Sequence, residues 1–522
     1  MSNTVTMSLE TPDAVSQITK TLQSNGYEAF VVGGCVRDLL LGKSPKDWDM
    51  ATNATPEQIQ ACFEHTFYEN DFGTVGVVQD DIVDELALLH EKQSKAADAE
   101  DKENYQSKIN QLEALKVIEI TPYRTEQKYS DGRRPDSVSF SDNIHDDLKR
   151  RDFTINALAY DCTSGELIDD FGGIADLQSK TLRCVGEPNE RFAEDGLRIL
   201  RAVRIAIEHG LTISKETQEA IINQAKLLEK VSRERIRDEF IRMLQSKEPM
   251  RAMLLAKDLH VLSYISPDLE RGVGVDQNGA HKYDVFEHLL RTMQHGADRD
   301  WSLVIRLAGL FHDISKPETR RWNKEKNDWT FYGHEVVGAR VTKKALEDLK
   351  FSREIVSRVT TLVRWHMFFS DPDQITLSAV RRIIRNVGPD NVWDLIRLRI
   401  CDRIGMGRPK EKSYRLRQYT AMMDEAMRSP ISVKDLKLNG DQMIAELHMK
   451  PGRRMGWILH ALMNITLFEP ENNNKEFLVK QALEYDKLSD KELQQLAEQG
   501  KEAISQAEAD EIKKIKRKHR IA

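Results

Sequence analysis

The 522-residue sequence predicts an α+β protein whose strands lie in the first part of the chain and whose remainder is helical. Up to about residue 170, short runs of β-branched and aromatic residues alternate with helix-like segments. From about Glu190 onward, apolar residues recur at helical spacing almost without interruption. We therefore expect an N-terminal head with a mixed β-sheet and helices, followed by an all-α neck, body and tail.

Composition excludes several classes of protein. The chain is 40% hydrophobic and 31% charged, and it has no apolar run near the ~18 residues of a membrane helix. Its start has neither the basic segment nor the apolar stretch of a signal peptide. Five cysteines lie scattered without metal or disulfide spacing, which is typical of reduced thiols in the cytoplasm. We expect a cytoplasmic protein without a membrane partner, and the oligomeric state stays open.

The charge distribution is compatible with nucleic-acid binding but does not require it. The net charge is −7, but arginine gathers in residues 124–204 and 381–408, and residues 513–520 are basic. Local patches decide phosphate contacts more than the total does. Ordinary solvated faces explain these stretches equally well.

The first elements of the head suggest a phosphate site. Residues 28–32 predict a strand that ends at Gly33-Gly34, and a helix follows at 36–41. Glycines between a strand and a helix let backbone N–H groups approach a phosphate at the positive end of the helix. Arg37 would add a fixed cationic donor.

Two carboxylates follow on the next predicted strand, residues 47–50. Asp47 and Asp49 alternate along it, so their side chains point to the same face. Converging carboxylates bind Mg²⁺ ions that bridge triphosphate oxygens. Alone, each of these patterns is typical of a turn or a loop, and the order in which they occur carries the interpretation.

The rest of the head continues with short strands and helices. Thr55 and Pro56 begin a helix with a cap residue and a proline in the first turn. Residues 72–79 and 117–121 predict two more strands. The charged segment between them, about 80–115, predicts an inserted helical hairpin, with disorder as the alternative.

This order of motifs resembles class II nucleotidyltransferases, the group that holds bacterial CCA-adding enzymes and bacterial poly(A) polymerases. Later segments resemble the family's ribose and phosphate motif, its hinge motif, its base-selecting motif and its neck-helix motif: residues 146–157, 169–177, 194–204 and 232–239. The resemblance implies in-line attack by a primer 3′-OH on an α-phosphate, with pyrophosphate leaving and with Asp47 and Asp49 holding two Mg²⁺ ions. Glu119 is a candidate third carboxylate, although a solvent-facing strand glutamate is the simpler explanation.

The resemblance also implies a set of nucleotide contacts. Arg151 and Asp152 would contact the triphosphate and ribose, with Asn156 nearby. Asp195 and Arg198, three residues apart on a helix, would share a face and read the Watson–Crick edges of cytosine and adenine. Two further arginines would continue this stripe and meet phosphates: Arg201 and Arg204.

The helical half contains a second possible metal site. His312-Asp313 interrupts an apolar helix, and widely spaced histidines and an aspartate surround it in the chain in an order that resembles the HD metal-phosphohydrolase superfamily. The resemblance implies one metal set and two residues that could complete a second ion: His288, His312, Asp313 and Asp402, then His334 and His366. Imidazole with carboxylate suits a divalent transition metal. Such helices can bind metal and turn over phosphoesters, or they can persist as a tRNA-binding body without catalysis.

The motifs divide the chain into four parts: a head at 1–170 with its insertion, a nucleotide-selecting neck at 171–265, an HD domain at 266–410 and a helical tRNA-binding tail at 411–522. The resemblance implies template-independent addition of C, C and A from CTP and ATP to the 3′ end of tRNA. Three alternatives stay open. One is addition of only A or only CC, and another is a poly(A) polymerase, although the basic segment typical of that enzyme is missing from residues 65–75. The third is an HD phosphohydrolase whose head merely binds nucleotide.

Overall fold

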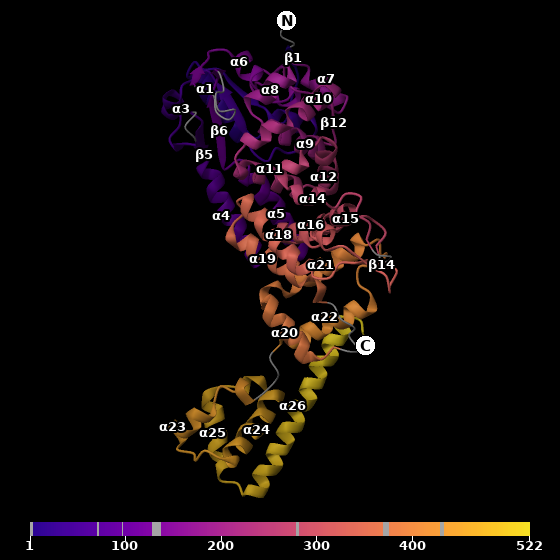
Figure 1. Cartoon of the computed structure of the whole chain (residues 1–522). Helices are drawn as coiled ribbons and strands as arrows, with labels where there is room; N and C mark the ends of the chain where they lie inside the picture. Colours follow the sequence, from indigo (N-terminus) through magenta and orange to yellow (C-terminus); the bar gives the residue numbers. More distant parts are fainter. Residues whose placement is uncertain are drawn as a thin grey trace.

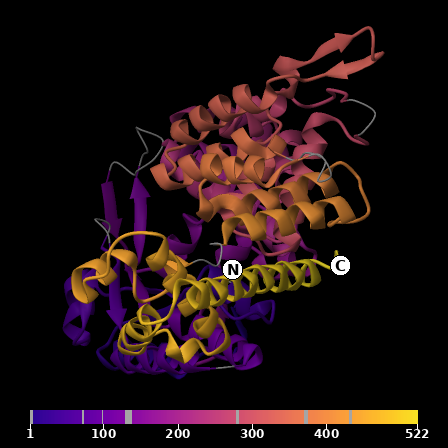
Figure 2. The same cartoon turned by 90° about the horizontal axis from the view of Figure 1, so that it is seen from below.

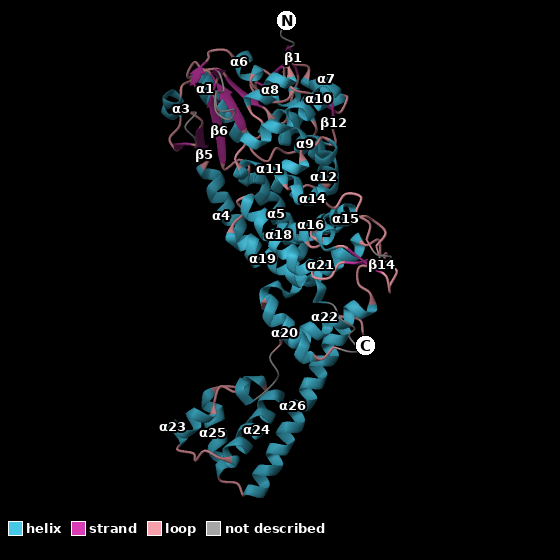
Figure 3. Ribbon diagram, in the orientation of Figure 1, coloured by secondary structure: helices cyan, strands magenta, loops and turns pink. Residues whose placement is uncertain are grey.

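The computed structural model describes residues 4–69, 73–96, 98–127, 137–277, 281–368, 375–428 and 433–521. The molecule is elongated, with a head at one end, a helical body in the middle and a small helical arm at the other end (Figure 1). Most strands gather in the head, and the remainder is almost entirely helical (Figure 3). The α+β class predicted from the sequence is confirmed.

The head contains an eight-stranded mixed sheet in the order β1-β10-β9-β2-β3-β6-β5-β4. Of the strand neighbours described in it, β3 and β6 run parallel and the others antiparallel. The strands are β1 (Thr4–Thr6), β2 (Ala29–Val32), β3 (Asp49–Thr52), β4 (Thr66–Tyr68), β5 (Val75–Val78), β6 (Val117–Pro122), β9 (Ala159–Tyr160) and β10 (Glu166–Ile168). A separate hairpin joins β7 (Arg124–Gln127) to β8 (Ser137–Phe140).

Alternation along β6 separates the head's core from its functional face. Ile118 and Ile120 are fully buried in the main hydrophobic core, whereas Glu119 points to the other side of the sheet. Helices cover the sheet and flank its strands: α1 (Asp13–Ser24), α2 (Gly34–Leu40), α3 (Pro56–Cys62), α6 (Ile144–Lys149) and α7 (Gly173–Gln178). The predicted start of α3 is confirmed, because Thr55 and Gln58 form a capping box ahead of it.

The charged insertion is a helical hairpin, as predicted, made of α4 (Asp80–Lys95) and α5 (Ala99–Glu113). It has a small core of its own around Leu86, Leu89 and Ile109. The hairpin grows from the ends of the antiparallel neighbours β5 and β6, where the amide of Gln79 donates to the carbonyl of Lys116 at 3.0 Å. Of the strand predicted at 72–79, Phe72 lies outside the described residues.

The neck and body follow as helices packed side by side. They comprise α8 (Pro188–Glu194), α9 (Leu197–His209), α10 (Lys215–Gln224), α11 (Arg233–Gln245), α12 (Pro249–Asp258), α13 (Leu262–Ile265), α14 (Pro267–Glu270), α15 (Val285–Asp298), α16 (Leu303–Phe311), α17 (Lys316–Thr319), α18 (His334–Asp348), α19 (Arg353–Trp365), α20 (Leu377–Val387) and α21 (Val392–Gly405). Two exceptions were not predicted from the sequence. One is a short parallel pair, β11 (Thr181–Leu182) with β12 (Thr212–Ile213). The other is a hairpin in the body, β13 (Arg321–Asn323) with β14 (Asp328–Thr330).

The arm has its own hydrophobic core, separate from that of the body. Its helices are α23 (Gly440–Leu447), α24 (Arg453–Phe468) and α25 (Lys475–Asp486), reached after α22 (Tyr414–Met427). The long α26 (Asp490–Lys518) then runs back from the arm to the body (Figure 1). Gly500 lets α26 lie directly on α24, since a Cβ there would come within 2.0 Å of the His460 carbonyl oxygen. None of the described helices is long and apolar enough to cross a membrane.

Candidate active site and metal centre

The backbone of the turn between β2 and α2 lies against the guanidinium of Arg151. Gly33 has a φ of +73° and stands at the N-terminus of α2. A Cβ at Gly33 would lie 2.6 Å from Nη1 of Arg151, so glycine is needed for this close approach. Arg151 is held there by Asp147, whose Oδ2 accepts from its Nη2 at 3.0 Å. The strand–turn–helix expected from the sequence thus lies beside the arginine of a later motif.

Three carboxylates lie next to this turn. Asp49 begins β3 and Asp47 precedes it, so the strand predicted at 47–50 starts two residues late. Glu119 on β6 is the register partner of Asp49 across the parallel pair, which places both side chains on the same face of the sheet. Glu119 is half-buried there.

A buried cysteine ties the two aspartates to α2. The Cys35 thiol donates to the carbonyl oxygen of Asp47 at 3.2 Å and accepts from the amide of Asp49 at 3.1 Å. This role was not predicted from the sequence. The position of Cys35 directly after the two glycines is the only signal in the sequence, and a small buried thiol is ordinarily mere packing.

The electrostatics of the three carboxylates favour a bound cation. Burial, followed by repulsion from Asp47, raises the pKa of Asp49 to about 6, although Arg151 acts in the opposite direction. Burial and repulsion from Asp49 raise the pKa of Glu119 to about 7. Oxygen ligands that repel one another in a half-buried site fit Mg²⁺, which would offset that repulsion.

A polar network connects the turn to the neck. Arg37 donates from Nη1 to the side-chain oxygen of Asn156 at 2.8 Å, and Asn156 donates to Asp152 at 3.0 Å. Arg201 of α9 completes the chain with its Nη2 2.7 Å from Oδ2 of Asp152. Despite its burial, Asp152 has a pKa held well below its usual range by Arg201 and these hydrogen bonds. Residues expected to contact ribose and phosphate therefore form one connected group.

The expected arrangement of Asp195 and Arg198 on one helix is wrong in detail. Asp195 lies in extended backbone between α8 and α9, where its Oδ1 accepts from the amide of Leu197 at 3.0 Å. Arg235 of α11 donates a hydrogen bond to this carboxylate, with Nη2 2.7 Å from Oδ2. Arg198 is buried, and it donates to Glu194 at 2.5 Å and to backbone carbonyls. The extended backbone of Asp195 (φ −147°, ψ 105°) interrupts the helix that the spacing suggested.

Arg204 is enclosed between helices. It is buried and donates to Glu239 of α11 at 2.6 Å and to Glu208 at 2.7 Å. In this structure it joins α9 to α11, and a phosphate contact requires those pairs to open. Arg235 and Glu239 both belong to the segment 232–239, which the sequence singles out only as a neck motif.

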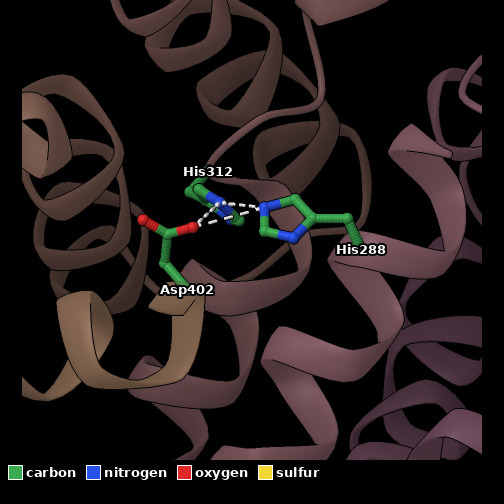
Figure 4. A group of neighbouring side chains, drawn as sticks. All are labelled: His288, His312 and Asp402. Carbon is green, nitrogen blue, oxygen red and sulfur yellow. Dashed lines mark hydrogen bonds and ion pairs between the residues drawn. The ribbon is translucent and has the colours of Figure 1, made fainter. Parts of the chain in front are cut away.

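In the body, six metal-ligating side chains come together from five elements. His288, His312 and Asp402 point toward one another from α15, the end of α16 and α21 (Figure 4). Asp313, His334 and His366 form a second group, and in each group the ligand atoms lie within 4.8 Å of one another. Asp313 was expected with the first set. It contacts both, because Oδ2 lies 3.1 Å from His288 Nε2 and Oδ1 lies 3.2 Å from His334 Nε2.

Hydrogen bonds orient three of these imidazoles toward the centre. The Nδ1 atoms of His312, His334 and His366 lie 2.9, 2.6 and 2.7 Å from the backbone carbonyl oxygens of Gly309, Phe331 and Val363. An Nδ1–H bonded to a carbonyl leaves Nε2 as the metal-facing atom. Although burial opposes it, interactions with His312 and Lys316 hold the pKa of Asp313 well below its usual range. Against the opposing effect of burial, the neighbouring carboxylates raise the pKa of His312 to about 10. A metal bound here would therefore take the place of the imidazole proton, and imidazole and carboxylate ligands together suit a divalent transition metal.

A lysine at this centre was not predicted from the sequence. Lys316 is buried and its Nζ lies 2.6 Å from both Asp313 Oδ2 and Gln277 Oε1. It follows His312-Asp313 by one helical turn, so the i, i+3 spacing from Asp313 was the available signal.

Three family models match successive parts of the chain. The Poly A polymerase head domain matches residues 29–113 and 87–183, the probable RNA and SrmB-binding site of polymerase A matches 210–272, and the HD domain matches 285–404. A CCA-adding enzyme of Lactiplantibacillus plantarum is 30% identical over 475 residues, covering 89% of this chain and 94% of the relative. One from Enterococcus faecalis is 42% identical over 227 residues, covering 44% and 48%.

A solved structure has the same fold. The Bacillus stearothermophilus CCA-adding enzyme in complex with CTP superimposes with a TM-score of 0.54 at 24% identity, covering 91% of this chain and 98% of that one. The resemblance found in the sequence motifs is confirmed by the long alignment to relatives and by the matched domains. This chain belongs to the CCA-adding enzyme family of nucleotidyltransferases and carries an HD domain.

Proposed function

We propose that the chain adds C, C and A, taken from CTP and ATP, to the 3′ end of tRNA without a nucleic-acid template. The observation that carries this proposal is the meeting of Asp49 and Glu119 on one sheet face, beside the turn at Gly33 and the guanidinium of Arg151. Relatives named CCA-adding enzyme support the choice of activity.

In the proposed reaction, Asp47 and Asp49 hold Mg²⁺, with Glu119 as the third carboxylate. When held by these carboxylates, Mg²⁺ would supply charge that offsets the triphosphate and would favour ionisation of the 3′-OH, which attacks the α-phosphate while pyrophosphate leaves. The amides at Gly33-Gly34 and the guanidinium of Arg151 bind the triphosphate. Two more side chains, Arg37 and Asn156, align the ribose end of the nucleotide through their link to Asp152.

Base selection in this proposal belongs to Asp195 and Arg198. Asp195 supplies acceptors and Arg198 planar donors for the edges of cytosine and adenine. Arg198 has to leave Glu194 to reach a base, so nucleotide entry and a shift of this side chain are coupled. Arg201 and Arg204 would meet phosphates only after their pairs with Asp152 and Glu239 open.

For the body, we propose a divalent transition metal centre with a secondary phosphohydrolase activity. The two groups of ligand atoms and their carbonyl-bonded imidazoles support it. The centre lies in the HD domain, whose boundaries we place at 266–410. The head at 1–170, the neck at 171–265 and the tail at 411–522 complete the proposed division, with tRNA lying against the helical parts.

Incorporation of labelled CTP and ATP, each alone and together, onto tRNA lacking its 3′ end tests the transferase. The proposal predicts two cytidines with CTP alone and a complete CCA end with both nucleotides. ATP-only extension of tRNA ending in CC selects the A-adding alternative, and a product that stops at CC selects the CC-adding one. Long adenosine tracts select a poly(A) polymerase, and absence of any incorporation leaves an HD phosphohydrolase with a nucleotide-binding head.

A further inference from the structure

One aromatic ring lies in the same row of the head's sheet as two of the carboxylates. Phe67 of β4 pairs with Gly76 of the antiparallel neighbour β5. Gly76 in turn pairs with Glu119 of β6, and Glu119 pairs with Asp49 of β3. Side chains of directly paired residues lie on the same face of a sheet. Phe67 therefore belongs to the face that carries the proposed metal-binding carboxylates.

The absence of a side chain at Gly76 determines where this ring lies. A Cβ at Gly76 would come within 2.6 Å of Cζ and 2.8 Å of Cε1 of Phe67. The ring therefore lies over the backbone of β5, one strand away from Glu119. Phe67 is 39% exposed, whereas Val75 and Ile120 of the next row are fully buried on the other face. The ring thus gives this polar face of the sheet an apolar surface beside the carboxylates.

The order of the strands places the ring and the proposed triphosphate site on opposite sides of the carboxylates. Across the sheet, the strand before the turn, β2, is followed by β3 and β6 with the carboxylates and then by β5 beneath the ring. In-line transfer requires the attacking 3′-OH and the leaving pyrophosphate to lie on opposite sides of the α-phosphate. Since Gly33 and Arg151 would bind the triphosphate on the β2 side, the primer's 3′-OH has to approach from the β5 side.

The base of the incoming nucleotide already has a proposed site in the neck, at Asp195 and Arg198. The ring of Phe67 is therefore left for the other nucleotide of the reaction, which is the last one of the primer. The primer ends in a different base as the CCA end grows, and stacking accepts any base because every base has a π-face. An aromatic ring thus suits a site whose occupant changes from one cycle to the next.

We infer that Phe67 is a primer-positioning residue: its ring stacks on the 3′-terminal base of the tRNA and holds the adjoining 3′-OH at the carboxylates of Asp49 and Glu119. This inference rests on the proposed nucleotide addition and adds the contact that places its second substrate. The stacking site belongs to the head and not to the metal centre of the body. In Figure 2 the indigo and purple head and the β13–β14 hairpin of the body lie at opposite ends of the view.

Single-nucleotide addition tests the role of the ring. The substrates are tRNA lacking its 3′ end with CTP, and tRNA ending in CC with ATP. We expect Phe67→Ala to lower kcat/KM for tRNA roughly tenfold or more, with the KM of the nucleotide within about twofold. Phe67→Tyr keeps the ring and should behave like the unmodified chain. Phe67→Leu keeps bulk over Gly76 but lacks a flat face, so it should lose activity in a chain whose edge strand is still packed.

A primer without its terminal base separates stacking from packing. With tRNA whose 3′-terminal nucleotide is abasic, Phe67→Ala and the unmodified chain should react at the same reduced rate, because the ring has no base to stack on. A ring that only packs on β5 would give the same ratio of rates with either primer. Tyr68→Ala is the matched control, since it removes the next aromatic residue of β4, 51% exposed, on the other face of the strand.

The outcomes distinguish this inference from the proposed function. An unmodified chain that extends neither primer overturns nucleotide addition, and the stacking role with it. Normal kcat/KM for tRNA in Phe67→Ala and Phe67→Leu, or an equal loss with the complete and the abasic primer, overturns the stacking role alone. A loss confined to the KM of the nucleotide would assign the ring to the incoming base and would also overturn the inference.

Discussion

Arg235 of α11 grips both carboxylate oxygens of Asp195, with Nη1 3.1 Å from Oδ1 and Nη2 2.7 Å from Oδ2. The acceptor proposed to read the incoming base is therefore oriented by a helix of the neck. A planar, doubly bonded partner fixes the rotation of a carboxylate in a way that one ammonium cannot.

Replacing Arg235 tests this orientation. We expect Arg235→Ala to lower kcat/KM for CTP and ATP roughly tenfold to a hundredfold, because the loss of a charge-assisted pair costs about 1.5–3 kcal/mol. Arg235→Lys keeps the charge but loses the two parallel N–H donors of the guanidinium. It should therefore also relax discrimination between the two nucleotides. The control is Arg251→Ala, which removes an exposed arginine paired with Glu248. Unchanged kinetics in both Arg235 variants would mean that Asp195 is oriented by something else.

Two glycines with positive φ allow the turn to be compared with an ordinary helix end. Gly33 (φ +73°, ψ −129°) and Gly42 (φ +66°) both have backbones that disfavour alanine. Only at Gly33 does the new Cβ meet Arg151, whose guanidinium must then leave the turn. We expect Gly33→Ala to lower kcat/KM at least tenfold and Gly42→Ala to leave it within about twofold. Equal losses of kcat/KM in the two variants would show that the position of Arg151 beside Gly33 does not affect nucleotide addition.

Local patterns in the sequence predicted the turn at Gly33, the paired aspartates and the insertion, because each depends on neighbouring residues. These local patterns did not predict which distant residues meet in the folded structure. The extended backbone of Asp195 leaves this residue outside α9, and the burial of Arg204 against Glu239 depends on how α9 meets α11. The grouping of Asp313 follows from helix packing in the body, which residue order does not determine. The β13–β14 hairpin was missed because its polar residues lack the alternation of a half-buried strand.

Metal content of the full chain checks the body's two ligand groups. We expect about two transition-metal ions per chain by elemental analysis, falling to about one in His366→Ala, because each group offers three ligand side chains. Nucleotide addition in Mg²⁺ should persist in this variant, since the head has its own carboxylates. His90→Ala, on the exposed face of α4, is the control. A metal content that does not change in His366→Ala would contradict the second group.

His209, in α9 of the neck, makes the stability of the folded chain depend on pH. Burial and the nearby cation of Arg37 lower its pKa from 6.5 to about 3. Between these values the unfolded chain binds a proton that the folded chain does not, so stability falls as the pH decreases below 6.5. From pH 7 to pH 5 this amounts to about 2 kcal/mol. His209→Gln should lose correspondingly less in chemical denaturation, while exposed His90→Gln should behave like the unmodified chain.

The most direct test of the proposed active site is nucleotide incorporation onto tRNA lacking its 3′ end, by the unmodified chain and by Asp47→Ala. We predict a complete CCA end with CTP and ATP for the unmodified chain. For Asp47→Ala we predict at least a thousandfold slower addition, with the metal content of the body unchanged. An unmodified chain that adds no nucleotide, or an Asp47→Ala chain that adds them at the normal rate, would contradict the proposed active site.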